Sequence, residues 1–256
     1  MWSKLRNFLA LCLFASLPAH AADRELLIYC GITMVRPMNE IARNFERLEN
    51  VKISMAQGGS EDLYQSARKS RQGDLYLPGE PTYRSKYVSE GLLGEVVTVG
   101  YNQLAIMVAK GNPRKVKGDL KELLRDDLAI MIGNATTGSV GKETKDVLDT
   151  VGLYDKVVER AILLAPDSRV LSNAMKKGEA DAILNWRAVG FFSDNVQFVD
   201  VVDLDARLAK PQALLLNLLT FSNNPALARR FMAYAAGTEG QAIFRKHGFL
   251  DNSVVR

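Results

Sequence analysis

One stretch near the N-terminus limits the possible folds of this chain more than any other. Residues 26–30 are apolar or aromatic and end at Gly31, as expected for a short strand that is covered on both faces. Pro37 suits the first turn of a following helix, where its missing N–H costs nothing. Apolar side chains then recur with helical spacing at Met38, Ile41, Ala42 and Phe45. Because backbone N–H groups are free at a helix N-terminus, this strand–turn–helix predicts one wall of an anion-binding cleft.

Strands and helices alternate along the rest of the chain, which predicts an α/β fold with a mainly parallel sheet. Two parts of the chain also resemble each other. Residues 57–60 and 136–139 both place a glycine and a serine before a helix. Residues 73–77 and 180–184 both pass through an aspartate into a strand. The sequence therefore predicts two similar α/β lobes.

The chain is expected to cross between these lobes twice. Extended segments near residues 98–104 and 212–219 are the predicted crossovers. The first lobe then comprises residues 22–100 and 217–256, and the second comprises residues 101–216. Two crossovers form a hinge on which the lobes can close around a ligand.

Residues 1–21 have the features of a secretory signal peptide. Lys4 and Arg6 precede an apolar run over residues 8–17, and Ala19-His20-Ala21 forms a small-x-small cleavage site. The run is shorter than the roughly 20 residues that a membrane helix needs. We expect cleavage near Ala21 and export of the mature chain to the periplasm.

Charge and composition exclude several kinds of partner and site. Without the signal peptide the formal charge falls from +4 to about +2, and the basic cluster at 110–121 has no interleaved aromatic residue, so no nucleic-acid partner is expected.

Cys30 is the only cysteine left, which excludes an internal disulfide, and we interpret it as a small buried hydrophobe. His247 is the one remaining histidine, so neither a metal site nor a serine–histidine pair is expected.

An enzyme is the least favoured class. Asp74 and Asp181 could act as an acid and a base, but each more often ends a helix-to-strand turn. The chain has no phosphate-loop or dinucleotide fingerprint, and no cofactor is expected.

Helix starts that carry a hydroxyl or a glycine are the main candidates for binding. They are Thr33–Met38, Gly59–Asp62, Gly138–Gly141 and Ser168–Leu171. Because open α/β sheets bind ligands at the carboxyl ends of their strands, all four are expected to face the cleft. The alternative is that each hydroxyl only caps its own helix. Two starts from each lobe favour an oxyanion held by hydroxyls and backbone amides.

Charged and aromatic side chains lie near these turns in the sequence. Arg36, Arg169 and Arg187 offer bidentate contacts to a carboxylate, phosphate or sulfate-like ligand, with a solvated side chain as the alternative for each. Asn185 and Trp186 are expected to cover the ligand, and core packing is the alternative for Trp186.

Several segments, in order over nearly the whole mature chain, carry a family resemblance. They are residues 28–34, 38–45, 58–60, 73–79, 110–113 and 244–249. Their succession resembles the molybdate-binding periplasmic proteins of ABC importers. The resemblance implies the periplasmic-binding-protein type II fold, with two similar α/β lobes, a hinge of two crossover segments and a central cleft. It also implies that hydroxyls and backbone amides hold a tetrahedral oxyanion.

By position, the resemblance assigns ligand contacts to Thr33, to Ser60 or Gly59, to the backbone of Val140 and to Ser168. A tyrosine of the family falls on Asn185, with Trp186 beside it, so one hydroxyl donor is lost. Arg36 and Arg187 add positive charge to a pocket that usually works with neutral donors. The resemblance therefore implies the fold, while the identity of the anion stays open.

We predict a periplasmic solute-binding protein that captures a small, molybdate-like oxyanion between its lobes, without catalysis. It is expected to be a monomer that delivers the anion to an ABC permease in the inner membrane. Two alternatives stay open, a ligand-sensing accessory protein of a membrane receptor and a binder of a small organic acid.

Overall fold

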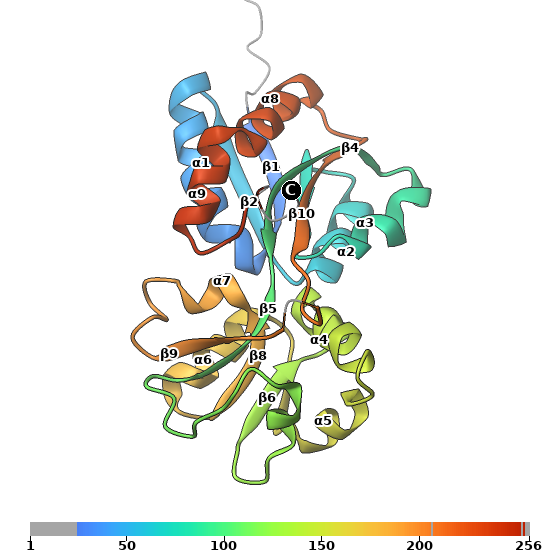
Figure 1. Cartoon of the computed structure of the whole chain (residues 1–256). Helices are drawn as coiled ribbons and strands as arrows, with labels where there is room; N and C mark the ends of the chain where they lie inside the picture. Colours follow the sequence, from blue (N-terminus) through green and yellow to red (C-terminus); the bar gives the residue numbers. More distant parts are fainter. Residues whose placement is uncertain (1–24, 206, 252, 254–256) are drawn as a thin grey trace, which may run out of the picture.

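The computed structural model describes residues 25–205, 207–251 and 253. The signal peptide predicted at residues 1–21 lies outside them. The described chain forms two lobes, one above the other in Figure 1, and each lobe is built on its own five-stranded sheet. We call them the first lobe and the second lobe.

The sheet of the first lobe has the strand order β2-β1-β3-β10-β4. Its strands are β1 (Glu25–Gly31), β2 (Lys52–Gly58), β3 (Leu75–Leu77), β4 (Leu93–Asn102) and β10 (Gln212–Leu219). Its helices are η1 (Ile32–Met34), α1 (Val35–Glu49), α2 (Ser60–Ser70), α3 (Thr82–Tyr87), η2 (Val88–Glu90), α8 (Pro225–Ala236) and α9 (Thr238–Lys246).

The sheet of the second lobe has the strand order β7-β6-β8-β5-β9. Its strands are β5 (Leu104–Ala109), β6 (Ile130–Gly133), β7 (Leu163–Ala165), β8 (Ala182–Trp186) and β9 (Val199–Asp203). Its helices are η3 (Leu120–Leu124), α4 (Ser139–Asp149), α5 (Tyr154–Arg160), α6 (Ser168–Lys177) and α7 (Arg187–Gly190).

The two sheets have equivalent topologies. In each sheet the first three strands in spatial order are parallel, and the next one, β10 or β5, pairs antiparallel with both of its neighbours. Four of the five strands in each sheet therefore run in the same direction, as predicted for a mainly parallel sheet, and β10 or β5 runs opposite because it is the strand that has crossed from the other lobe. The alternation of strands and helices is confirmed.

The first crossover runs where the sequence predicts it, whereas the second precedes the predicted segment at 212–219, which forms β10 of the first lobe. Only Gln103 separates β4 from β5, and the second connection leads from β9 into β10. The Gln103 Nε2 donates to the Ala209 carbonyl oxygen over 2.7 Å, which ties the two connections together. The predicted lobe boundaries at 100 and 217 fall inside β4 and β10, which pair with each other in the first lobe. The residue bounds of the lobes stay a prediction.

Asp74 and Asp181 occupy equivalent places in the two lobes. The Leu27 N–H donates to Asp74 Oδ2 over 2.9 Å, and the Asp74 N–H returns a bond to the Leu27 carbonyl. Ala129 and Asp181 repeat this exchange in the second lobe, again with 2.9 Å to Asp181 Oδ2. Each aspartate thus fixes the start of the neighbouring strand, and the similarity of residues 73–77 and 180–184 has a structural basis.

The apolar face predicted for the first helix packs into the core. Met38, Ile41, Ala42 and Phe45 of α1 are all buried. The Phe45 ring meets the Phe231 ring of α8 edge-on, with centroids 5.2 Å apart. Cys30 is fully buried, and burial raises the pKa of its thiol far above the usual range, as expected for a packed rather than a reactive side chain. No helix in the described part of the chain has the length and apolar character needed to cross a membrane.

We expect Asp74→Ala to lower the free energy of unfolding by about 1–3 kcal/mol, because the Leu27 N–H loses its acceptor in a largely buried place. Asp74→Asn is the matched control, since its amide oxygen can still accept that bond. Urea unfolding measures both variants. Equal stability of Asp74→Ala and the unmodified protein would show that this carboxylate does not hold the strand.

Candidate functional site

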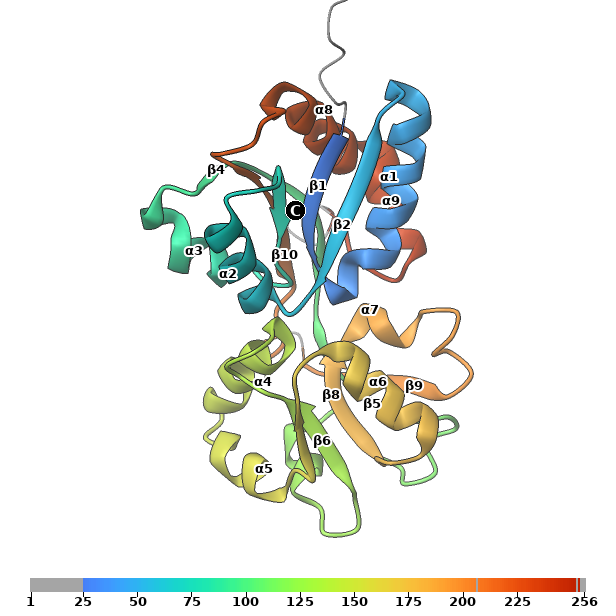
Figure 2. The ribbon, with the colours of Figure 1, turned by 180° about the vertical axis from the view of Figure 1, so that it is seen from behind.

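The predicted helix starts meet between the lobes. In the first lobe β1 leads into η1 and α1, and β2 leads into α2; in the second lobe β6 is followed by α4, and β7 by α6. Seen from behind, the lower end of α2 lies above α4, and the lower end of α1 lies above α6 and α7 (Figure 2). Parts of all four starts line one small cavity, with Thr33, Gly59, Ser60, Val140 and Ser168 among its lining residues.

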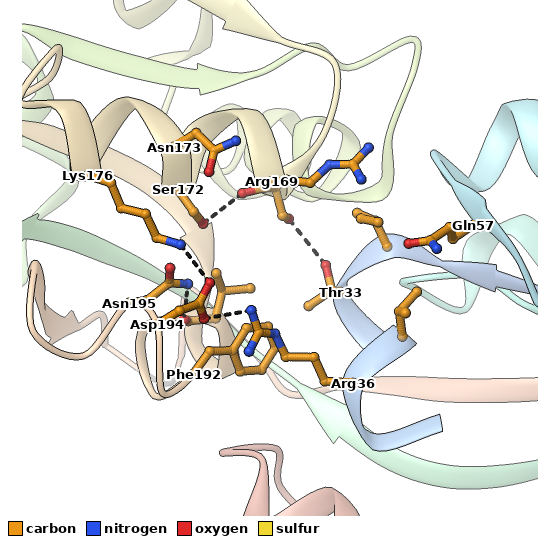
Figure 3. Close-up of a pocket in the computed structure, with 14 residues that line it drawn as sticks. Thr33, Arg36, Gln57, Arg169, Ser172, Asn173, Lys176, Phe192, Asp194 and Asn195 are labelled. Atoms are coloured by element: carbon orange, nitrogen blue, oxygen red, sulfur yellow. Dashed lines mark hydrogen bonds and ion pairs between the residues drawn. The ribbon is translucent and has the colours of Figure 1, made fainter. Parts of the chain in front are cut away.

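The lobes touch at this small cavity. Thr33 Oγ1 of the first lobe donates to Ser168 Oγ of the second over 3.3 Å (Figure 3). A Cβ at Gly59 would stand 2.6 Å from the Thr137 carbonyl oxygen, and one at Gly79 would stand 2.0 Å from Ser139 Oγ. Glycine is needed at both positions for such a close approach. The cavity has a volume of about 10 Å³, so the lobes are closed on each other.

Most of these helix starts have no side-chain cap, contrary to the alternative that each hydroxyl only caps its own helix. No side-chain hydrogen bond caps η1, α1, α2 or α4. Ser60, expected as the N-cap of its helix, is instead the first helical residue after Gly59, and its Oγ accepts from the Gly79 N–H over 3.0 Å. The exception is α6, where the Asp167 carboxylate accepts from the N–H groups of Arg169 and Val170.

This arrangement presents mainly hydrogen-bond donors to the small cavity. Thr33, Ser60, Ser139 and Ser168 are all buried, so their hydroxyls are shielded from bulk water. The N–H groups in the first turn of an uncapped helix have no intrahelical acceptor, and the helix dipole makes them favourable partners for an anion. Asp167, which also lines this cavity, directs its carboxylate to the α6 backbone.

The structure corrects the expected positions of Asn185 and Trp186. Both are fully buried and lie behind the helix starts rather than over the cavity. The Asn185 Nδ2 donates to the Ser168 carbonyl over 3.2 Å, and the Trp186 indole N–H donates to Ser139 Oγ over 3.3 Å. The two side chains therefore orient the serines of α6 and α4, and Trp186 packs in the core.

Arg187 also departs from its expected position. Its Nε donates to Asp203 Oδ1 over 2.8 Å, and its guanidinium lies over the Phe191 ring, 4.6 Å from the centroid. It is absent from the described lining of the small cavity. Arg187 therefore does not add the positive charge expected there, because Asp203 already neutralises it.

Sequence reasoning did not single out Gly79 or the Ser139 side chain. Both line the small cavity, from opposite lobes. The signal for Gly79 is its place two residues after the buried residues 75–77, whose strand ends at the same edge as β1. Ser139 is the serine of the repeated glycine–serine pair, whereas the family resemblance assigns a contact only to the adjacent Val140.

A larger cavity of about 340 Å³ adjoins the small one, and Thr33 and Ser168 line both. Arg36 and Arg169, predicted to approach the ligand, lie in this larger cavity. Arg36 and Lys176, from opposite lobes, both point to Asp194 (Figure 3), with N–O distances of 2.6 and 2.7 Å. Partial burial opposes the ionisation of Asp194, but the Lys176 hydrogen bond and the Arg36 charge outweigh it and lower the pKa of this carboxyl.

Glu80 and Glu143 are buried carboxyls on opposite lobes near the small cavity. Glu80 follows Gly79, and Glu143 lies on α4, where its Oε1 accepts from Gln212 over 3.0 Å. Burial raises the pKa of Glu80 and raises that of Glu143 to about 7, with the Glu80 charge adding to the shift of Glu143. Closure of the lobes thus holds two like charges together when both are ionised.

The described residues contain no group of three or more histidine, cysteine, aspartate or glutamate side chains placed to hold a metal ion. The site is therefore described by its hydroxyls, backbone amides and ion pairs alone.

We expect Glu143→Gln to change how stability depends on pH. Between the ordinary pKa of 4.5 and about 7, unfolded Glu143 releases its proton while folded Glu143 keeps it, so stability falls as the pH rises, by about 3 kcal/mol in total. Glutamine keeps the oxygen that accepts from Gln212 and removes this fall. The variant should be the more stable protein at about pH 8 and equal to the unmodified one at about pH 4.

Thermal unfolding at both pH values measures this effect. Glu159→Gln, a change at an exposed position of α5, is the matched control and should leave the pH dependence as it is. Parallel pH profiles for Glu143→Gln and the unmodified protein would contradict the raised pKa.

Comparison with known proteins places this geometry among binding proteins. Residues 26–250 match the family model described as bacterial extracellular solute-binding protein. The chain is 22% identical to the molybdate-binding protein ModA of Mycobacterium bovis over 242 residues, which cover 92% of this chain and 88% of that protein.

Solved structures show the same fold. The periplasmic molybdate-binding protein of Azotobacter vinelandii superposes with a TM-score of 0.75 at 18% identity, covering 88% of this chain and 98% of that chain. The sulfate-binding protein SubI from Mycobacterium tuberculosis superposes with a TM-score of 0.80 at 14% identity, covering 90% and 88% of the two chains. At these identities the similarity bears on the fold alone, and the predicted fold class is confirmed.

Proposed function

The chain belongs to the bacterial extracellular solute-binding protein family, and we propose that it captures a small oxyanion between its lobes and delivers it to an ABC importer. The family consists of binding proteins rather than enzymes. The observation that carries the proposal is the meeting of uncapped helix starts and buried hydroxyls from both lobes at one cavity.

The proposed ligand contacts come from both lobes. The first lobe offers the Thr33 hydroxyl and, at the start of α2, the Ser60 hydroxyl or the backbone near Gly59. The second lobe offers the Val140 N–H and the Ser168 hydroxyl, with Ser139 as an additional donor. Donors of this kind bind an oxyanion through short hydrogen bonds and the helix dipoles without a lysine or an arginine.

Molybdate and related tetrahedral oxyanions are the first candidates for the ligand. The ModA relative is named for molybdate and the SubI structure for sulfate, and both anions present oxygens in the same tetrahedral arrangement. The closed cavity of about 10 Å³ has room for about one water molecule, so we propose that ligand enters when the lobes separate about the two crossovers. Closure would then complete the donor set around the anion.

The site of action follows from the family. We propose that the signal peptide exports the chain to the periplasm, where it acts as a monomer and meets an ABC permease of the inner membrane. A ligand-sensing accessory protein of a membrane receptor would use the same cavity. Genes for a permease and an ATPase beside the gene for this protein favour transport.

Isothermal titration against molybdate, tungstate, sulfate, phosphate and small carboxylates tests the proposal. We expect at least one anion of this panel to bind, and Thr33→Val to weaken it about tenfold or more, because a buried hydroxyl donor to the anion is lost. Thr98→Val, on β4 and away from both cavities, is the matched control. Absence of binding across the panel at millimolar concentration would overturn the proposed function.

A further inference from the structure

The larger cavity gives the anion site an open side of defined shape. Its volume of about 340 Å³ lies within the range of small-molecule sites. Ile32, Thr33 and Ser168 line both this cavity and the small one. An inorganic oxyanion at the helix starts would leave this space to solvent. A ligand with an organic body could place an acidic group at the helix starts and extend into the larger cavity.

Both lobes contribute to the lining, so closure encloses whatever lies there. Val35, Arg36 and Gln57 come from the first lobe, and Phe192 and Lys176 come from the second. The lining combines apolar side chains, which suit a short carbon chain, with the charged groups of Arg36, Lys176 and Asp194, which gather together (Figure 3). An apolar surface with a few convergent polar groups is the usual composition of a site for an organic ligand.

The charge of the lining favours a second acidic group. It contains three cationic side chains, Arg36, Arg169 and Lys176, against the single carboxylate of Asp194. Asp194 contacts both Arg36 and Lys176, as a ligand carboxylate would. The Arg36 and Asp194 side chains are 40% and 46% exposed, so the pair can be reached from solvent and exchanged.

We propose that the ligand is a small organic molecule with two acidic groups, one bound at the helix starts and the other, a carboxylate, bound by Arg36 and Lys176. This inference rests on the proposed function, since it requires the anion site at the helix starts. Asp194 forms ion pairs with both Arg36 and Lys176 when no second acidic group is present. It keeps them aligned across the lobes, and the ligand carboxylate competes with it. The guanidinium of Arg36 also lies on the Phe192 ring, 4.7 Å from its centroid, which fixes its plane for a bidentate contact.

Calorimetric titration with two matched probes tests the second group. The probes are 3-phosphonopropionate and ethylphosphonate, which share the phosphonate and the carbon chain and differ in the terminal carboxylate. We expect the first to bind about tenfold or more tightly than the second, as for a charge-assisted contact. In the double variant Arg36→Gln, Lys176→Gln the two probes should bind with equal affinity.

Asp194→Asn separates a ligand contact from a structural role. With the competing charge removed, 3-phosphonopropionate should bind more tightly and ethylphosphonate should not change. A merely structural ion pair would instead weaken both probes together. Thermal unfolding of each variant shows that it is folded.

The remaining outcomes decide between the two proposals. Equal affinities of the two probes, or a difference that survives the double variant, would overturn the second acidic group and leave oxyanion binding at the helix starts intact. No binding of either probe, together with no binding of the inorganic anions, would overturn the proposed function and this inference with it.

Discussion

Uncapped helix N-termini that face each other across two lobes are the constraint on which the rest of this structure depends. The first turns of η1, α2 and α4 have no side-chain cap, and backbone N–H groups in such a place require an acceptor. The lobes approach closely enough to share one acceptor only because Gly59 and Gly79 carry no side chain. In the proposed site the backbone itself would be the main recognition surface, because free N–H groups at helix N-termini favour an anion.

The near-identical architecture of the lobes explains how this surface is assembled. Asp74 and Asp181 fix the starts of equivalent strands in the two lobes. The carboxyl ends of those strands therefore lie at equivalent edges of the two sheets. Each sheet also contains an antiparallel strand next to a crossover, β10 in one and β5 in the other. In the proposed closure, movement of the lobes would occur at the connections after β4 and before β10. The hydrogen bond from Gln103 to Ala209 couples these two connections, so they are expected to bend together.

Local sequence patterns predict much of this fold but little of the side-chain geometry. The helix starts, the two lobes and the crossovers follow from periodicity, glycine positions and the similarity of two segments. The antiparallel entry of β10 and β5 does not, because a strand's direction depends on where the chain has come from. The predicted position of Trp186 was wrong for a similar reason. A residue at a strand end can face the cleft or the core, and the packing behind α4 determines that Trp186 faces the core. The N-cap of α2 is Gly59 rather than Ser60, so the helix begins one residue earlier than predicted. This difference is within the usual uncertainty of helix ends.

In the proposed site, Arg36 would determine selectivity without binding the first anionic group. Had its guanidinium entered the small cavity unpaired, it would have attracted many small anions and offered little discrimination among them. The structure instead pairs it with Asp194 and stacks it on Phe192, in a larger cavity that begins where the small one ends. A ligand with one acidic group gains nothing from this pair, because it would have to break an existing ion pair without replacing it. A ligand with a carboxylate at the right distance replaces Asp194 and keeps both cations satisfied. Selectivity is a difference between two affinities, and in the proposed site a second acidic group strengthens binding only when its contacts with Arg36 and Lys176 are better than those of Asp194.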